Sequence, residues 1–148
     1  MEIIRRKTDY AIRALIHLAL HPHQETTTAE IAEEQEVPLE YLHKILQRLT
    51  HGNIVNSHRG AYGGLSLARD PEDINLLDII ETVQGKINMN KCFLGKNGCP
   101  RAPKCVFKSK WLQLEQKIAE FISQVTLQDL VDQVRQGGYQ EKGGEGEG

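Results

Sequence analysis

The three cysteines of this chain lie within one short segment, as Cys92, Cys99 and Cys105. The stretch from Thr82 to Leu114 that contains them holds seven Lys or Arg residues and no Asp or Glu. Such a cationic surrounding favours the thiolate form of cysteine, which is the form that binds metal. The segment therefore predicts a metal or iron–sulfur site.

The spacing of these cysteines separates three interpretations of the site. Six residues lie between Cys92 and Cys99, and five lie between Cys99 and Cys105. Structural zinc sites usually pair their cysteines about two to four residues apart. Wide loops around an iron–sulfur cluster fit this spacing better, with a fourth ligand from elsewhere in the protein. Structural zinc and a set of redox thiols without metal are the alternatives.

Composition limits the other possibilities. The chain has 148 residues, 39% of them hydrophobic, and no run approaches the roughly 18 apolar residues that a membrane helix needs. An odd number of cysteines, and a start at Met1-Glu2-Ile3-Ile4 without an apolar signal segment, argue against a disulfide framework. We expect a cytoplasmic protein with reduced cysteines. Its formal net charge of −2 means that any DNA-binding surface must come from a local arrangement.

Two successive helices are the first sign of such an arrangement. Thr27 and Glu30 form a capping box at the start of a short helix over 28–35. A second, leucine-lined helix has Pro38 at its first position and stops at Gly52. Two helices a few residues apart, the second one longer, are typical of a helix-turn-helix.

The segment after this helix pair predicts a wing. Two short strands are expected at 54–55 and 65–67, joined by the glycine-rich, cationic loop 57–64.

Apolar periodicity and capping residues predict the remaining helices. One runs from Asp9 to about residue 20, and another is capped by Asn75 and stops at Gly85. A long amphipathic helix covers 108–125, and Thr126 starts a last short one.

These elements predict a mainly α fold, a winged helix-turn-helix domain with a long C-terminal dimerisation helix. The expected division has four parts. It consists of a DNA-binding domain over 1–82, a cysteine-rich cluster-binding loop over 83–107, dimerisation helices over 108–136 and a disordered tail over 137–148.

Several side chains of the helix pair and wing are of the types that touch base edges and phosphates. The candidate DNA-binding residues are Thr28, Glu40, Tyr41, Lys44, Gln47, Arg48, Arg59 and Tyr62. The alternatives are a merely solvated helix face, an exposed loop arginine at Arg59 and a packing role for Tyr62.

Five short segments give the chain a specific family resemblance. They are Thr8-Asp9-Tyr10-Ala11, Tyr41-Leu42, Arg59-Gly60 with Gly63-Gly64, the three cysteines, and Thr126-Leu127-Gln128-Asp129-Leu130. From about Met1 to Arg135 the chain resembles the Rrf family of bacterial winged-helix regulators. Members of that family include iron–sulfur assembly regulators and nitric-oxide sensors.

The resemblance implies a two-fold dimer with crossing long helices and a two-iron or four-iron cluster close to the partner's DNA-binding domain. It assigns Cys92, Cys99 and Cys105 as cluster ligands, and Asp9 as a fourth ligand from the partner subunit. The alternative role for Asp9 is a helix cap. The chain has Lys108 where the assembly branch has a histidine, and its first cysteine spacing is one residue longer than in the nitric-oxide branch.

These observations together predict a homodimeric transcription factor, most simply a repressor, that binds an imperfect palindrome in double-stranded DNA under the control of an iron–sulfur cluster. No nucleophile–base pair or phosphate loop suggests an enzyme. The alternative is a zinc-stabilised or cluster-free thiol regulator or scaffold that acts through a protein partner.

Overall fold

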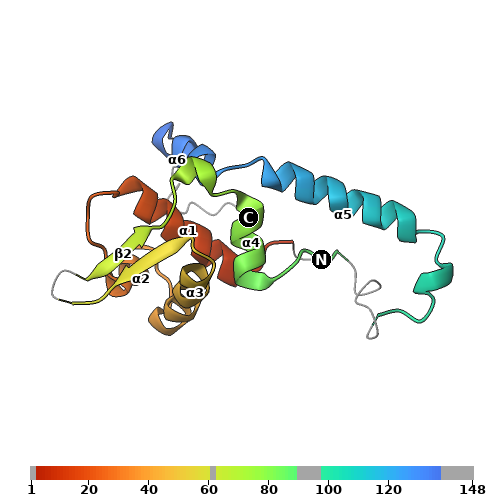
Figure 1. Cartoon of the computed structure of the whole chain (residues 1–148), viewed down its shortest axis with the longest axis horizontal. Coiled ribbons are helices and arrows are strands. Elements are labelled where there is room, and N and C mark those ends of the chain that lie inside the picture. The colour runs from red at the N-terminus through yellow and green to blue at the C-terminus, as the bar shows by residue number, and fades with distance from the viewer. Residues whose placement is uncertain (1–2, 61–62, 90–97, 138–148) are drawn as a thin grey trace, which may run out of the picture.

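The computed structural model describes residues 3–60, 63–89 and 98–137, and it is mostly helical (Figure 1). Its elements are α1 (Arg6–Leu20), α2 (Thr28–Glu34), α3 (Leu39–His51), β1 (Val55–His58), β2 (Gly64–Leu67), η1 (Pro71–Asp73), α4 (Leu76–Gln84), η4 (Ala102–Lys104), α5 (Lys108–Ser123) and α6 (Leu127–Arg135). No described helix is long and apolar enough to cross a membrane.

Local chemistry explains the helix-turn-helix formed by α2 and α3. The Thr27 hydroxyl accepts from the Glu30 amide, and the Glu30 carboxylate accepts from the Thr27 amide, which confirms the predicted capping box. Glu36 turns the chain with a φ of 52°, in the left-handed region. Pro38 is the N-cap of α3 rather than its first residue, and Gly52 is the C-cap, as expected.

The wing is a two-stranded antiparallel sheet with Val55 opposite Leu67 and His58 opposite Gly64. Ser57 and His58 belong to β1, so the strand extends into the predicted loop. The amide of Leu65 also donates to the Thr26 carbonyl at 2.8 Å, which fastens β2 beside the start of α2.

One apolar core joins the helices of the DNA-binding region. Leu15 of α1, Leu42 of α3, Ile79 of α4 and Leu127 of α6 are each fully buried in it. We call the body formed by α1 to α4, the sheet, η1 and α6 the head.

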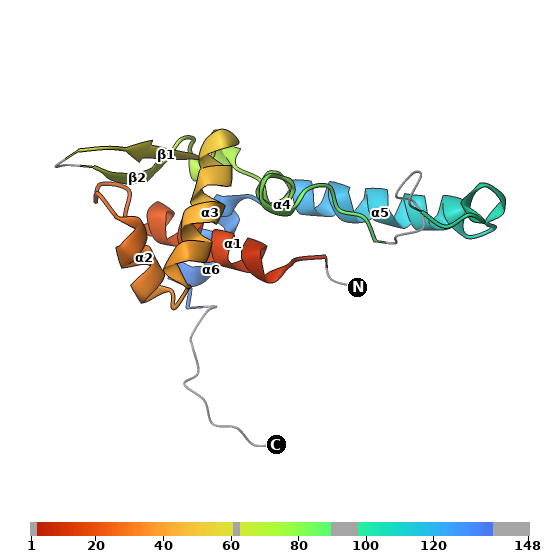
Figure 2. The same cartoon turned by 90° about the horizontal axis from the view of Figure 1, so that it is seen from below.

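A second region, which we call the arm, consists of residues 98–123 with η4 and α5. Figure 2 shows it extending from the head on the side opposite the wing. The C-terminal part of α5 packs on the head, where Ile122 and Ile118 meet Ile80 of α4. The helix ends at Ser123, so Val125 lies beyond it and not on its apolar stripe.

The chain returns to the head directly after the arm. The Leu76 amide donates to the Val125 carbonyl at 2.8 Å, and the Leu127 amide donates to the Ile74 carbonyl at 2.7 Å. Val131 of α6 is buried in the core of the head. The predicted 108–136 segment therefore contains two helices with different surroundings.

Candidate nucleic-acid interface and cysteine arm

The α3 helix divides its side chains between core and solvent. Leu42, Ile45, Leu46 and Leu49 are buried against the head. The opposite face carries four of the predicted contact residues, all exposed: Glu40, Tyr41, Lys44 and Gln47. A rigid helix with donors, acceptors and an aromatic ring on its free face has the surface that reads a major groove.

Arg48 differs from these four because its guanidinium is directed to α4. Its Nη1 donates to the Val83 carbonyl at 2.9 Å. That carbonyl is in the last turn of α4, where backbone acceptors have no partner within the helix. In this structure Arg48 thus joins α3 to α4.

The other predicted contact residues flank α3. Thr28 is the first residue of α2 and is half-buried, and Arg59 is exposed beyond the end of β1. Tyr62 lies outside the described residues.

The arm carries two of the three predicted cluster ligands. Cys99 is exposed and Cys105 is half-buried, and both are free thiols. Successive turns join them, because the Ala102 amide donates to the Cys99 carbonyl and the Cys105 amide donates to the Ala102 carbonyl. Cys92 lies outside the described residues.

The surroundings of these thiols are cationic and open. Arg101, Lys104, Lys108 and Lys110 are all exposed. Within the described ranges, no three His, Cys, Asp or Glu side chains converge on a common metal position. Sulfur donors among exposed cations are of the kind that could hold an iron–sulfur cluster.

Asp9 is not a helix cap, which corrects one of its two predicted roles. Arg5 is the N-cap of α1, and Asp9 lies within the first turns of the helix. Its carboxylate pairs with Arg13 at 2.8 Å, and Arg13 Nη1 donates to the Gln35 carbonyl at 3.4 Å. Arg13 thus links Asp9 to the turn that precedes α3.

Sequence reasoning missed Gln84, the last residue of α4. Its carboxamide binds three groups at the start of α1, which lie 76 to 81 residues earlier in the chain. A glutamine on a helix carries no local signal of such distant partners, so only the folded structure reveals it.

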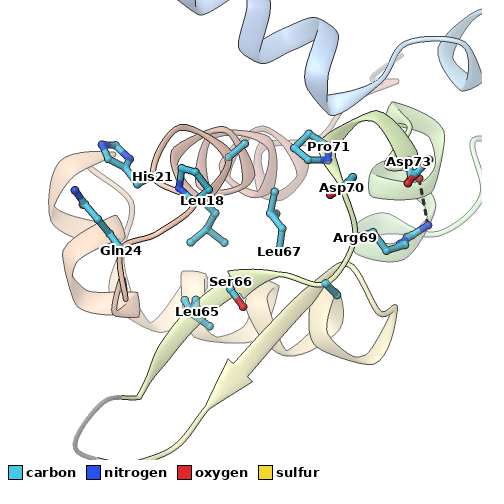
Figure 3. A pocket seen from close by; sticks show the side chains of 13 residues that line it. Leu18, His21, Gln24, Leu65, Ser66, Leu67, Arg69, Asp70, Pro71 and Asp73 are labelled. Atoms are coloured by element: carbon cyan, nitrogen blue, oxygen red, sulfur yellow. Dashed lines mark hydrogen bonds between the residues drawn. The ribbon is translucent and has the colours of Figure 1, made fainter.

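An open cavity of about 500 Å³ lies at the base of the wing, between the end of α1, β2 and η1 (Figure 3). Leu18 and Leu67 line its apolar part, and His21, Gln24 and Arg69 line its polar part. None of its lining residues is a predicted site residue, so it is separate from both the α3 face and the cysteines.

Comparison with known families assigns the chain. The Rrf2 model, described as an iron-dependent transcriptional regulator, matches residues 4–133. The chain belongs to the Rrf2 family. The Rrf resemblance, the winged-helix class and the expectation of a regulator rather than an enzyme are thereby confirmed.

Relatives in the Rrf2 family are similar over most of the chain. The HTH-type transcriptional regulator IscR of Xenorhabdus nematophila is 32% identical over 126 residues, which cover 84% of this chain and 76% of that protein. IscR of Sodalis glossinidius is 35% identical over 126 residues, with the same coverage.

Solved structures agree with this assignment. IscR of T. potens has a TM-score of 0.73 at 28% identity, covering 93% of this chain and 92% of the other. CymR, described as the global cysteine regulator of B. subtilis, has a TM-score of 0.71 at 27% identity, covering 89% and 98%. This Rrf2 protein is therefore a DNA-binding transcriptional regulator similar to IscR.

Proposed function

We propose that this regulator is a homodimer, most simply a repressor, whose binding to an imperfect palindrome depends on an iron–sulfur cluster. The observation that carries the proposal is the pair Cys99, which is exposed, and Cys105, which is half-buried, among exposed cations on an arm outside the reading head. The match to a family of iron-dependent regulators supports it.

Cys92, Cys99 and Cys105 would supply three thiolate ligands, and the partner's first helix would supply Asp9. The side chain of Asp9 is 48% exposed, so its carboxylate is accessible to a second molecule. A bound cluster supplies a centre that responds to oxidants, nitric oxide or iron supply.

The dimer would form through the arm. Phe107, the N-cap of α5, is 63% exposed, and Trp111 and Leu114 on the helix are each 39% exposed. Large apolar side chains exposed close together are typical of an interaction surface. A second arm crossing the first would cover them and would bring the cysteines of one subunit near the head of the other.

The link from ligand to DNA would run through Arg13. When Asp9 serves as a ligand, its carboxylate is less available to Arg13, which also holds the Gln35 carbonyl. The contact between Arg13 and the turn that joins α2 to α3 then changes, and this change alters the orientation of the exposed face of α3.

Lys44 on α3 and Arg59 at the wing would supply phosphate contacts, while Tyr41 and Gln47 would contact bases. Lys44→Ala should weaken operator binding uniformly and reduce the salt slope by about one unit. Tyr41→Ala should change sequence preference more than salt dependence. Arg48→Ala should have an additional structural effect, because Arg48 holds Val83.

Anaerobic purification tests the proposal. We expect a brown protein with iron and inorganic sulfide, an oxygen-labile visible absorption, a dimeric mass and an operator affinity that changes when the cluster is removed. Cys99→Ala should abolish the absorption without unfolding the head. Stoichiometric zinc with no iron or sulfide would instead establish the zinc-stabilised alternative.

A further inference from the structure

The last turn of α4 holds the start of α1 through one side chain. Gln84 Oε1 accepts from the Arg5 amide at 3.0 Å and from the Thr8 hydroxyl at 2.6 Å. Gln84 Nε2 donates to the Ile3 carbonyl at 2.8 Å. The orientation of the amide is fixed by this set, because Ile3 offers an acceptor and the Arg5 backbone offers a donor.

The preceding residue of α4 holds α3. The Val83 carbonyl accepts from Arg48 at 2.9 Å, so neighbouring residues of one helical turn bind both α1 and α3. The cations converge here as well. Burial, and then the charges of Arg48 and Arg5, lower the pKa of Lys7.

The same turn leads directly into the cysteine segment. Gly85 follows with a φ of 89°, a conformation that residues with a side chain rarely adopt. Ile87 and Met89 are then buried, and the Met89 amide donates to Glu115 of α5 at 3.2 Å. Cys92 comes three residues after Met89.

We propose that Gln84 is a positioning residue that couples the cysteine segment to the DNA-reading head of the same subunit. This inference rests on the proposed function and adds a second connection to the one through Arg13. A rearrangement of the cysteine segment displaces the end of α4, and the three hydrogen bonds of Gln84 transfer the displacement to the start of α1.

Two features make this connection stiff enough to transmit a displacement. Thr8 is fully buried, so it has no access to water that could replace Gln84 as its partner. Asp9 follows Thr8 in the same helix, so the position of the candidate ligand depends on the same three bonds.

The experiment measures one ratio, the operator affinity of the cluster-loaded dimer divided by that of the cluster-free dimer. Coupled sites typically change each other's affinity by roughly 5- to 150-fold. In Gln84→Ala the ratio should move most of the way from its wild-type value toward one. Cluster content per subunit should stay at the wild-type level. Gln133→Ala, at an exposed position on α6, is the matched control and should keep the wild-type ratio.

A second variant separates coupling from folding. Gln84→Glu keeps two acceptors for Arg5 and Thr8 among nearby cations, so it should restore a large part of the ratio. A lost phosphate contact lowers both affinities equally and leaves the ratio unchanged, so such a result in Gln84→Ala overturns the inference. A wild-type ratio of one would instead overturn the proposed cluster control itself.

Discussion

The head and the arm use apolar side chains in opposite ways. In the head, residues such as Leu15 and Leu42 are fully buried by their own chain, whereas Phe107 and Trp111 of the arm stay exposed in the single subunit. The head therefore buries its own apolar side chains, whereas the arm leaves large ones exposed. This difference is what the proposed dimer contact through the arm predicts. Mutations in the two regions should accordingly change different measurements.

The largest effect is expected in the core of the head. Leu15→Ala leaves a cavity in the apolar core of the head and should lower the free energy of unfolding by about 2–5 kcal/mol. Lys117→Ala, at an exposed position on α5, should change it by less than about 0.5 kcal/mol. Urea unfolding monitored by circular dichroism measures the free energy of unfolding of both variants. Equal losses in Leu15→Ala and Lys117→Ala would contradict the distinction between head and arm.

The second effect concerns assembly. Trp111→Glu places a charge where we expect the second arm, and it should weaken dimerisation by at least about 2 kcal/mol, a value typical of interface anchors. Gln113→Glu on the same helix is the charge-matched control. Sedimentation velocity should find a monomer for Trp111→Glu with a head that unfolds normally. A wild-type monomer at micromolar concentration contradicts the dimer.

The third prediction concerns the pH dependence of stability, and it rests on a contact between α1 and α2. His17 is buried, with Nδ1 3.0 Å from the Glu34 carboxylate. Burial lowers the pKa of His17 below 6.5, and the Glu34 charge opposes this only partly. The unfolded chain therefore takes up a proton first as pH falls, so His17 favours folding above pH 6.5 and this contribution declines below it.

Replacing this histidine should flatten the pH dependence of stability. His17→Gln should have a shallower decline of the free energy of unfolding below pH 6.5 than the wild type, whereas His23→Gln, at an exposed site, should not. Urea titrations at several pH values measure the slopes. Equal slopes in wild type and His17→Gln would assign the acid sensitivity to other groups.

The smallest effect on stability is expected at Asp9. Its pair with Arg13 is half-exposed, so Asp9→Asn should cost only about 0.3–0.5 kcal/mol. The same variant should change the visible spectrum of the anaerobic dimer, since an amide is a poorer ligand than a carboxylate. An unchanged spectrum together with unchanged DNA switching would leave the Arg13 pair as the role of Asp9.

Much of the fold was predictable because its signals are local. The capping boxes at Thr27 and Thr126 and the stop at Gly52 each depend on residues within one turn, and all three are present. Element ends were less accurate. The first helix begins at Arg6 rather than Asp9, because its first turn is held by Gln84 and not by a nearby capping residue.

The candidate site was predictable in its residue types but not in its connections. The exposed face of α3 follows from helical periodicity alone. The inward direction of Arg48 does not, because its acceptor lies 35 residues away, and the same holds for Gln84. Long-range polar contacts of this kind depend on how helices pack, which no local pattern encodes.

Because the chain returns to the head after the arm, the last part of the head is synthesised after the arm. The ribosome completes α4 before the cysteines, and 42 residues separate Gln84 from Leu127 of α6. At about 5–20 residues per second, that interval lasts roughly 2–8 seconds. By the end of this interval the three cysteines have been synthesised, whereas Leu127 and Val131 of the core have not. The core of the head is therefore completed only after the arm has been synthesised.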